Sequence, residues 1–236
     1  MNTQPKTVLI TGASRGLGLA LARALADEGW SLIINARNSE TLQQIYAELS
    51  LKTRVTAVAG DILEPAHREA LSIAAKASRG LDAIINNAGK LGPSPQPELL
   101  DYPLNSLLDV YEMNVVAQLG ILQAVQHSIK PQAKIINVTS DAAVEAYPGW
   151  GGYGSSKAAF EHLSAVLQAE NPDWTVYWVD PGDMRTEMHQ AAFPGEDISD
   201  RPLPEASVPG FLALLNDQFE NGRYEARKVR TPVEIG

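Results

Sequence analysis

A glycine-rich turn near the start of the chain, set between an apolar run and a helical one, constrains the fold most. The run Thr7–Thr11 is short, apolar and β-rich, as buried parallel strands are. Gly12, Gly16 and Gly18 follow it, and Leu19–Glu28 has helical character. Glycines let the backbone approach a ligand closely, and the free N–H groups at a helix start attract an anion. The order of these parts predicts a phosphate-binding loop, although the glycine spacing is not G-x-G-x-x-G and an ordinary glycine turn is the alternative.

Short apolar runs and helical segments continue to alternate along the chain. The predicted strands are Ser31–Ala36, Arg54–Ala59, Asp82–Asn86, Ala133–Ser140 and Trp174–Val179, with a further edge strand expected in the last residues. The predicted helices are Ser39–Ser50, Pro65–Arg79, Leu104–Ile129, a helix from Tyr153 to about Ala169, and Pro209–Phe219. This alternation predicts an α/β fold of one domain over residues 1–236, with a doubly wound, mostly parallel sheet of about seven strands and helices on both faces.

Two proline-rich stretches, Leu91–Pro103 and Met184–Pro209, interrupt the alternation and are predicted to be irregular. Each follows a predicted strand, as do Asn86–Gly89, Ser140 and Pro181–Thr186. In a parallel sheet the segments that follow strands lie at the carboxyl edge, where ligands bind. We therefore expect the functional site at this edge.

The composition argues against several other classes of protein. A formal net charge of −9 and a pI near 4.9 argue against a general nucleic-acid or anionic-membrane surface. The chain has no cysteine, and its four histidines lack the spacing of a metal site. No apolar run reaches about eighteen residues, so no membrane span is expected. Met1–Lys6 leaves no room for a signal peptide before the first strand, so the expected location is the cytoplasm.

Tyr153 and Lys157 open the predicted helix that follows strand five. Residues four apart lie on the same face of a helix. An ammonium held beside a phenol favours the phenolate, so we expect Lys157 to lower the pKa of Tyr153 toward neutral pH. The pair is then a candidate general acid/base, and a surface pair on a helix is the alternative interpretation.

Two arginines bear on the choice of nucleotide. Arg37 stands just beyond the second predicted strand, where folds that prefer NAD carry an acidic residue for the ribose diol. No Asp or Glu occurs from Ser31 through Asn38, and Arg15 lies inside the glycine loop. Both cations could bind a 2′-phosphate, so NADP(H) is favoured over NAD(H).

Taken together, these motifs resemble those of the short-chain dehydrogenase/reductase family. The resemblance covers essentially the whole chain, in the family's order. Tyr153 and Lys157 match its catalytic pair, Ser140 lies thirteen residues before Tyr153 at the family's usual interval, and Asn114 matches its helix asparagine. Three further motifs are similar to its cofactor loop, its strand-four motif and its motif after strand six: Thr11-Gly12-x-x-x-Gly16-x-Gly18, Asn86-Asn87-Ala88-Gly89 and Pro181-Gly182-x-x-x-Thr186.

The resemblance implies a Rossmann fold and an NAD(P)-dependent oxidoreductase that transfers a hydride between the nicotinamide and a carbonyl or alcohol substrate. Tyr153 would be the general acid/base, Lys157 would lower its pKa and bind the nicotinamide ribose, and Ser140 would donate a hydrogen bond to the substrate oxygen. Asn114 would hold a water for proton relay. The implied catalytic residues are thus Asn114, Ser140, Tyr153 and Lys157.

The implied cofactor-binding residues come from the glycine loop and from the segments at the carboxyl edge. Asp61 would bind the adenine, and Thr186 would position the carboxamide. Met184 departs from the branched aliphatic residue that is common in the family. The full set is Gly12, Ser14, Arg15, Gly16, Leu17, Gly18, Arg37, Asp61, Ile62, Asn87, Ala88, Gly89, Tyr153, Lys157, Pro181, Gly182, Met184 and Thr186.

Substrate and assembly are less constrained. Apolar residues at the carboxyl edge suggest a hydrophobic or aromatic carbonyl more than a charged metabolite: Leu91, Tyr147, Trp150, Met184, Met188 and Phe193. His189 could also touch the substrate. The alternatives are a non-catalytic, dinucleotide-binding regulatory protein and an epimerase or dehydratase on the same scaffold. The resemblance further suggests a homodimer or homotetramer packed through the Asn114 and Tyr153 helices.

Overall fold

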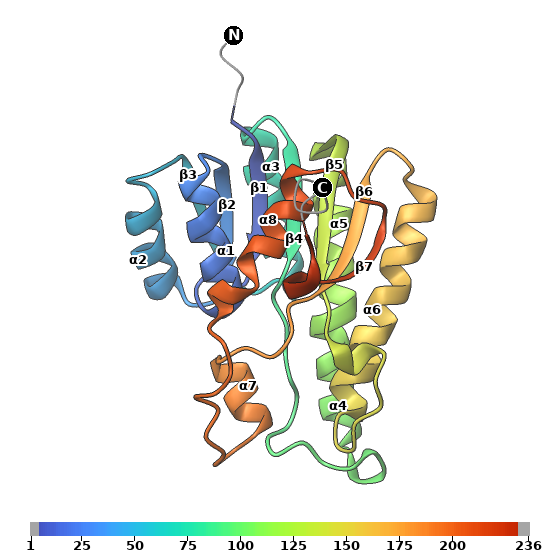
Figure 1. The fold of residues 1–236 in the computed structure, drawn as a ribbon. Helices are drawn as coiled ribbons and strands as arrows, with labels where there is room; N and C mark the ends of the chain where they lie inside the picture. Colours follow the sequence, from blue (N-terminus) through green and yellow to red (C-terminus); the bar gives the residue numbers. More distant parts are fainter. Residues whose placement is uncertain (1–4, 231–236) are drawn as a thin grey trace.

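The computed structural model describes residues 5–230 and is built on one parallel sheet (Figure 1). Its seven strands have the spatial order β3-β2-β1-β4-β5-β6-β7, and every neighbouring pair is parallel. The predicted doubly wound α/β fold is therefore confirmed. The strands are β1 Thr7–Thr11, β2 Ser31–Ala36, β3 Val55–Ala59, β4 Leu81–Asn86, β5 Ile129–Val138, β6 Thr175–Asp180 and the edge strand β7 Gly222–Glu225. Residues 231–236, to which the expected edge strand could also have extended, lie outside the described part.

Helices cover both faces of the sheet, and each face has its own apolar core. Successive strand residues alternate between the cores: Val8 and Ile10 pack on one side, and Leu9 packs on the other. The first core includes residues of α1, α2 and α8, and the second includes residues of α3 and α5. Burial on both faces explains why the strands read as continuous apolar runs. The helices are α1 Gly16–Asp27, α2 Ser39–Leu49, α3 Pro65–Ala77, α4 Leu104–Tyr111, α5 Ala117–Val125, α6 Gly151–Glu170, α7 Glu187–Ala192 and α8 Val208–Asn216.

The long helix predicted over Leu104–Ile129 is interrupted. A π-helical turn, η2 (Glu112–Val116), separates α4 from α5 and carries the fully buried Asn114. Inserted turns of this kind often mark functional sites. The helical part ends at Ser128, and β5 begins at Ile129, four residues before the predicted start at Ala133, because Ile129 pairs with Leu81 of β4. That pairing joins residues far apart in the chain, so no local sequence pattern indicates it.

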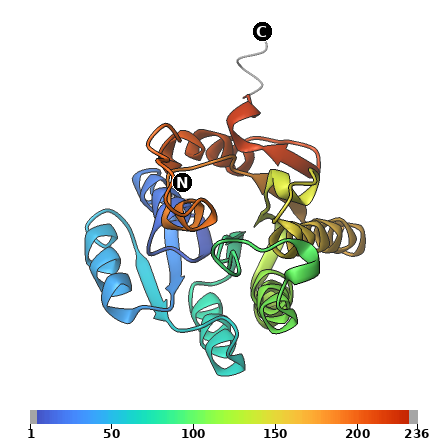
Figure 2. The same ribbon diagram turned by 90° about the horizontal axis from the view of Figure 1, so that it is seen from below.

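The segments after the strands gather at the carboxyl edge, which lies below the sheet in Figure 1 and faces the viewer in Figure 2. The stretch 184–209 was expected to be irregular throughout, but it contains α7 and a short 3₁₀ turn, η5 (Pro204–Ala206). Thr186 caps α7, because its Oγ1 accepts from the N–H of His189 at 3.2 Å. Among the described helices, none is both long enough and apolar enough to cross a membrane.

The glycine loop owes its shape to two separate requirements. Gly12 and Gly16 have positive φ angles of 68° and 54°, which favour glycine. Gly18 lies inside α1, and a Cβ placed there would come within 2.2 Å of the carbonyl oxygen of Gly12 and 2.6 Å of Asn87 Nδ2. The loop after β1 and the loop after β4 therefore meet at Gly18.

We expect Gly18→Ala to lower the free energy of unfolding by about 3 kcal/mol, because the backbone of Gly12 has to move to admit a methyl group. Gly120→Ala in α5 is the control, since the three atoms nearest its Cβ would belong to the Arg68 side chain and not to backbone, and a helix-interior alanine is favoured. Urea unfolding of both variants measures the difference. Equal stabilities for the two would contradict the close approach at Gly18.

Candidate active site

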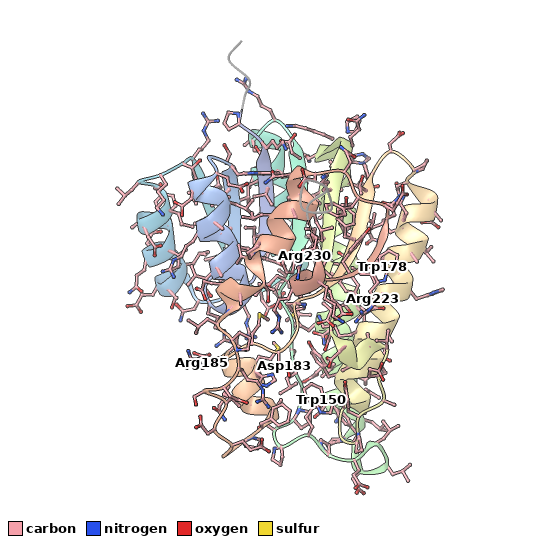
Figure 3. The ribbon with its side chains drawn as sticks, viewed as in Figure 1. Trp150, Trp178, Asp183, Arg185, Arg223 and Arg230 are labelled. Atoms are coloured by element: carbon pink, nitrogen blue, oxygen red, sulfur yellow. The ribbon has the colours of Figure 1, made fainter. Side chains whose placement is uncertain are left out.

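A cavity of about 90 Å³ lies at the carboxyl edge, between the ends of β5 and β6 and the segments that follow them. Trp150 and Asp183, which both line the cavity, are labelled below the sheet in Figure 3. The predicted catalytic residues Ser140 and Tyr153 both line the cavity. Its other lining residues are Leu91, Thr139, Asp141, Trp150, Asp180, Pro181, Gly182, Asp183, Met184, Thr186, Met188, His189 and Ala192.

Tyr153 and Lys157 occupy the first turns of α6, on the face that packs against the sheet. Tyr153 is 9% exposed and Lys157 is 4% exposed. The Lys157 ammonium donates to the carbonyl oxygen of Val138 at 2.8 Å and lies 5.6 Å from the centre of the Tyr153 ring. The structure therefore brings the predicted pair together, with the ammonium fixed by the end of β5.

The charge state of the pair differs from the sequence-based expectation. Burial raises the pKa of the Tyr153 phenol, and the carboxylates of Asp180 and Asp141 raise it further. Burial lowers the pKa of Lys157 to about 8, against a smaller opposing effect of Glu161. The predicted lowering of the Tyr153 pKa is therefore wrong for this structure. The loss of hydration and the nearby negative charges both favour the neutral phenol, so Tyr153 keeps its proton at neutral pH.

Ser140 follows β5, which ends at Val138, and is the N-cap of a 3₁₀ turn, η4 (Asp141–Ala143). Its hydroxyl donates to Asp141 Oδ1 at 2.8 Å and accepts from the N–H of Ala142 at 3.2 Å. The hydroxyl thus caps the turn, while the residue also lines the cavity.

Asn114 fastens the loop after β4 to α6. Its Oδ1 accepts from the Lys90 N–H at 2.8 Å, and its Nδ2 donates to the Lys90 carbonyl and to Ser156 Oγ, both at 2.9 Å. These bonds occupy both amide hydrogens. They give Asn114 a positioning role, and its holding of a water stays a prediction.

The glycine loop and the loop after β4 form one hydrogen-bonded unit. Asn87 Nδ2 donates to the carbonyls of Thr11 and Gly12 at 3.0 and 3.2 Å, while the N–H groups of Asn87 and Ala88 donate to Thr11 Oγ1. A Cβ on Gly89 would lie 3.8 Å from Lys157 Nζ, so this loop runs from the glycine turn to the Tyr153–Lys157 pair.

The start of α1 has the features of an anion site. Arg15 at the N-cap makes no side-chain cap, and no acidic residue stands in the first turn. The first N–H groups of a helix lack partners within the helix and carry a partial positive charge. Gly12 and Gly16 have no side chains that would keep a ligand from the backbone. The N-terminus of α1 therefore fits the phosphates of a dinucleotide.

The other predicted cofactor residues divide into exposed and buried groups. Arg37 pairs with Asp61 at 3.9 Å, and Arg15 pairs with Glu187 of α7. Both arginine side chains are about two-thirds exposed, and exposed ion pairs are weak enough to be exchanged for a phosphate. Leu17 and Ile62 are buried in the two cores, so only their backbones could meet a cofactor. Ser14 is half-buried beside Arg15, and Pro181, Gly182, Met184 and Thr186 line the cavity.

A network centred on Arg223 of β7 was not predicted. Arg223 donates to Glu161 at 3.1 Å, to the Ser140 carbonyl at 3.2 Å and to Asp180 at 3.3 Å, and Glu161 also accepts from Thr139 Oγ1 at 2.7 Å. The network ties the ends of β5 and β6 to α6 and the edge strand. An arginine in a four-residue strand carries no sequence signal for this role.

The buried Lys157 ammonium costs stability, since its folded-state pKa of about 8 lies below its ordinary value. The cost is fully present below pH 8 and disappears as the pH rises toward the unfolded-state pKa of about 10.4.

We therefore expect Lys157→Met to raise the free energy of unfolding at pH 7 by about 2 kcal/mol, after loss of the bond to Val138. Denaturant unfolding at several pH values measures the gain, which should shrink above pH 8. Lys52→Met, at an exposed ion pair with Asp27, is the control and should show no such pH window. A destabilised Lys157→Met protein would contradict this account.

Comparisons with known proteins agree with this geometry. The family model described as short chain dehydrogenase matches residues 6–197. The chain is 32% identical to sulfoacetaldehyde reductase 2 of Chromohalobacter salexigens over 86% of its own length and 82% of the relative's. It is 31% identical to the benzil reductase ((S)-benzoin forming) IRC24 of Saccharomyces cerevisiae, covering 97% and 88% of the two chains. A short chain dehydrogenase from Shigella flexneri complexed with NADP has a TM-score of 0.86 at 26% identity, covering 94% and 97%. The chain belongs to the short-chain dehydrogenase family.

Proposed function

We propose that this protein is an NADP(H)-dependent oxidoreductase that interconverts a carbonyl compound and its alcohol. The observation that carries the proposal is the meeting of Tyr153, Lys157 and Ser140 beside one cavity, with a phosphate-binding helix start on the same edge of the sheet. The bound nicotinamide would supply or accept the hydride. The chain itself has to hold the substrate oxygen and move one proton.

Tyr153 would be the proton donor in carbonyl reduction and the acceptor in alcohol oxidation. Because its pKa is raised, the phenol is protonated at neutral pH and ready to donate to the substrate oxygen. The phenolate left after transfer would be stabilised by the Lys157 ammonium, held near the ring by the carbonyl of Val138. Ser140 would turn its hydroxyl from Asp141 to the oxygen on which negative charge develops.

The residues proposed to hold the cofactor follow the edge of the sheet. The N–H groups from Gly16 to Gly18 would bind the phosphates, and Asp61 would bind the adenine. Arg15 and Arg37 would share a 2′-phosphate, and the relative whose structure contains NADP supports this preference. Lys157 would bind the nicotinamide ribose and Thr186 the carboxamide.

Assembly and location stay predictions. A homodimer or homotetramer is supported by exposed apolar side chains on the two expected helices, Leu104, Leu108 and Val116 on one and Val166 on the other. The cytoplasmic location rests on the sequence alone.

We expect Tyr153→Phe to lower kcat/KM for ketone reduction by about 10³-fold while NADPH binding is retained, because only the transferable proton is removed. Absorbance-monitored turnover on a panel of aldehydes and ketones measures the first quantity, and fluorescence titration measures the second. Tyr46→Phe in α2 is the control and should leave turnover unchanged.

The alternatives give different results in the same assay. Full activity of Tyr153→Phe would remove the proton-transfer assignment. Binding of NADPH with no turnover of the panel by the unmodified protein would favour a regulatory role. Conversion of a substrate without net cofactor consumption would favour an epimerase or dehydratase.

Cofactor preference is tested by Arg37→Ser. We expect the Kd for NADPH to rise about tenfold and the Kd for NADH to stay unchanged, since only NADPH carries the 2′-phosphate. Arg54→Ser is the matched control, because it removes the same charge from an exposed position before the amino end of β3, away from the carboxyl edge. An NADPH affinity that does not change in Arg37→Ser, or tighter binding of NADH by the unmodified protein, would refute the preference.

A further inference from the structure

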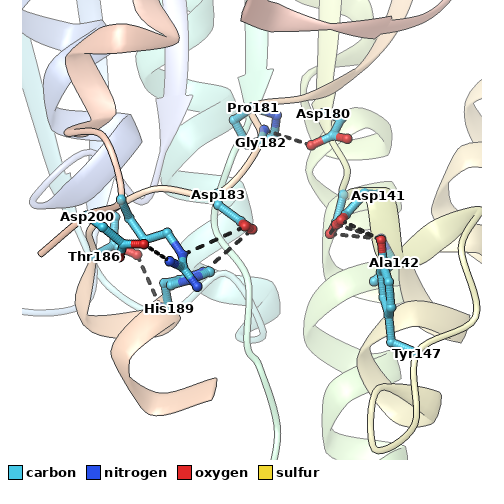
Figure 4. A network of polar contacts seen from close by, with 12 residues as sticks. Asp141, Ala142, Tyr147, Asp180, Pro181, Gly182, Asp183, Thr186, His189 and Asp200 are labelled. Atoms are coloured by element: carbon cyan, nitrogen blue, oxygen red, sulfur yellow. Dashed lines mark hydrogen bonds and ion pairs between the residues drawn. The ribbon is translucent and has the colours of Figure 1, made fainter. Parts of the chain in front are cut away.

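The cavity beside Tyr153 is unusually acidic for a site that has to attract a neutral carbonyl. Three carboxylates line it, those of Asp141, Asp180 and Asp183, and neither lysine nor arginine is among its described lining residues. Figure 4 shows Asp141 and Asp183 on opposite sides of one space, with Asp180 above them. They come from different segments, the turn after β5 and the end of β6 with its following loop.

The three carboxylates differ in how far the protein neutralises them. Asp180 is buried and accepts from Arg223 and from the Gly182 N–H. Asp183 has Arg201 at 4.0 Å. Asp141 accepts only from neutral donors, the Ser140 hydroxyl, the Ala142 N–H and the Tyr147 hydroxyl, and no cation lies within 4.0 Å of it in residues 5–230. Asp141 is therefore the carboxylate whose charge is left for a ligand.

His189 gives an independent indication of what that ligand carries. Its side chain is nine-tenths buried and lines the same cavity, and its Nε2 is buried with no hydrogen-bond partner among the described residues. Its Nδ1 lies 3.8 Å from Asp183 Oδ1, beyond hydrogen-bond distance, and the negative charge of that carboxylate favours the tautomer with the hydrogen on Nδ1. Burial lowers the pKa of His189, so the ring is neutral at pH 7. Nε2 is then an acceptor that lacks a donor, and an unmet buried acceptor is costly.

Apolar side chains supply much of the remaining lining. Leu91, Trp150, Met184 and Met188 line the same cavity, and the Trp150 ring meets the Tyr153 ring edge-to-face at a centroid separation of 5.9 Å. Such walls suit a hydrophobic or aromatic body. The apolar lining expected from the sequence is therefore present in part, and the carboxylates and His189 add acidic and acceptor groups to it.

We propose that the substrate is a carbonyl or alcohol compound with an apolar body and a protonated amine, with Asp141 as the counter-charge and His189 Nε2 as a second acceptor. This inference rests on the proposed function and names its substrate class. An ammonium beside Asp141 would also offset one of the charges that raise the pKa of Tyr153, which brings the phenol closer to proton transfer. The net charge of −9 draws cations toward the protein as a whole.

The test uses acetophenones that differ only in the para substituent: aminomethyl, hydroxymethyl or carboxylate. We expect kcat/KM with NADPH to be about tenfold higher for the aminomethyl ketone than for the hydroxymethyl ketone, and lowest for the carboxylate. In Asp141→Asn the ratio of the first two values should fall to about one. The ratio cancels any general loss of catalysis, and Asn can still accept from the Ala142 N–H.

Glu145→Gln is the matched control. It removes the same charge from an exposed position in the same loop, outside the cavity lining, and should leave the ratio unchanged. A ratio near one in the unmodified protein, or an equal fall in Glu145→Gln, would overturn the inference while leaving the oxidoreductase assignment intact.

Binding of unreactive amines separates the two proposals further. Calorimetry should give a Kd for benzylamine about tenfold lower than that for benzyl alcohol, with the difference lost in Asp141→Asn. Turnover of all three ketones without this difference would remove the cation site only. Absence of turnover together with this difference would remove the proposed reaction and keep the cation site.

Discussion

The parallel pairing of β4, β5 and β6 is the constraint on which the rest of the molecule depends. Parallel neighbours have to be joined by crossovers, so every strand delivers its next segment to the same edge of the sheet. Ser140 arrives there from β5 and Asp180 from β6, and α6 returns across the sheet with Tyr153 and Lys157. The cavity is the consequence of that topology, and the buried apolar strands supply the stability that lets the edge carry unfavourable chemistry.

The edge concentrates groups that would be more stable elsewhere. Lys157 is buried at a depressed pKa, Tyr153 is buried with its pKa raised, and Asp180 is kept beside them with its own pKa raised by burial. Arg223 offsets part of this cost, because it pairs with Asp180 and Glu161 and donates to the carbonyl of Ser140. Substitutions that relieve the burial of charge should therefore gain stability and lose activity, a trade expected wherever pKa values are tuned by burial.

Two opposite electrostatic environments share this edge. The start of α1 with Arg15 at its N-cap, together with Arg37 just after β2, suits an anion, whereas Asp141, Asp183 and the acceptor nitrogen of His189 suit a cation. The Arg15–Glu187 pair connects the first environment to α7, which also carries His189. An anionic cofactor and an amine-bearing substrate would thus be sorted by charge along one edge, and each would be disfavoured in the other's place.

The sequence by itself determined the sheet, the glycine loop and the identity of the Tyr153–Lys157 pair. Each is a local pattern: apolar runs of strand length, glycines at a turn, and two side chains four residues apart on a helix. Only the tertiary structure decided the π-helical turn at Asn114, the early start of β5, the partners of Arg223 and the direction of the Tyr153 pKa. These depend on burial and on contacts between residues far apart in the chain, such as Arg223 with Ser140. Hydration and Coulomb energies are set by such neighbours, and sequence spacing does not record them.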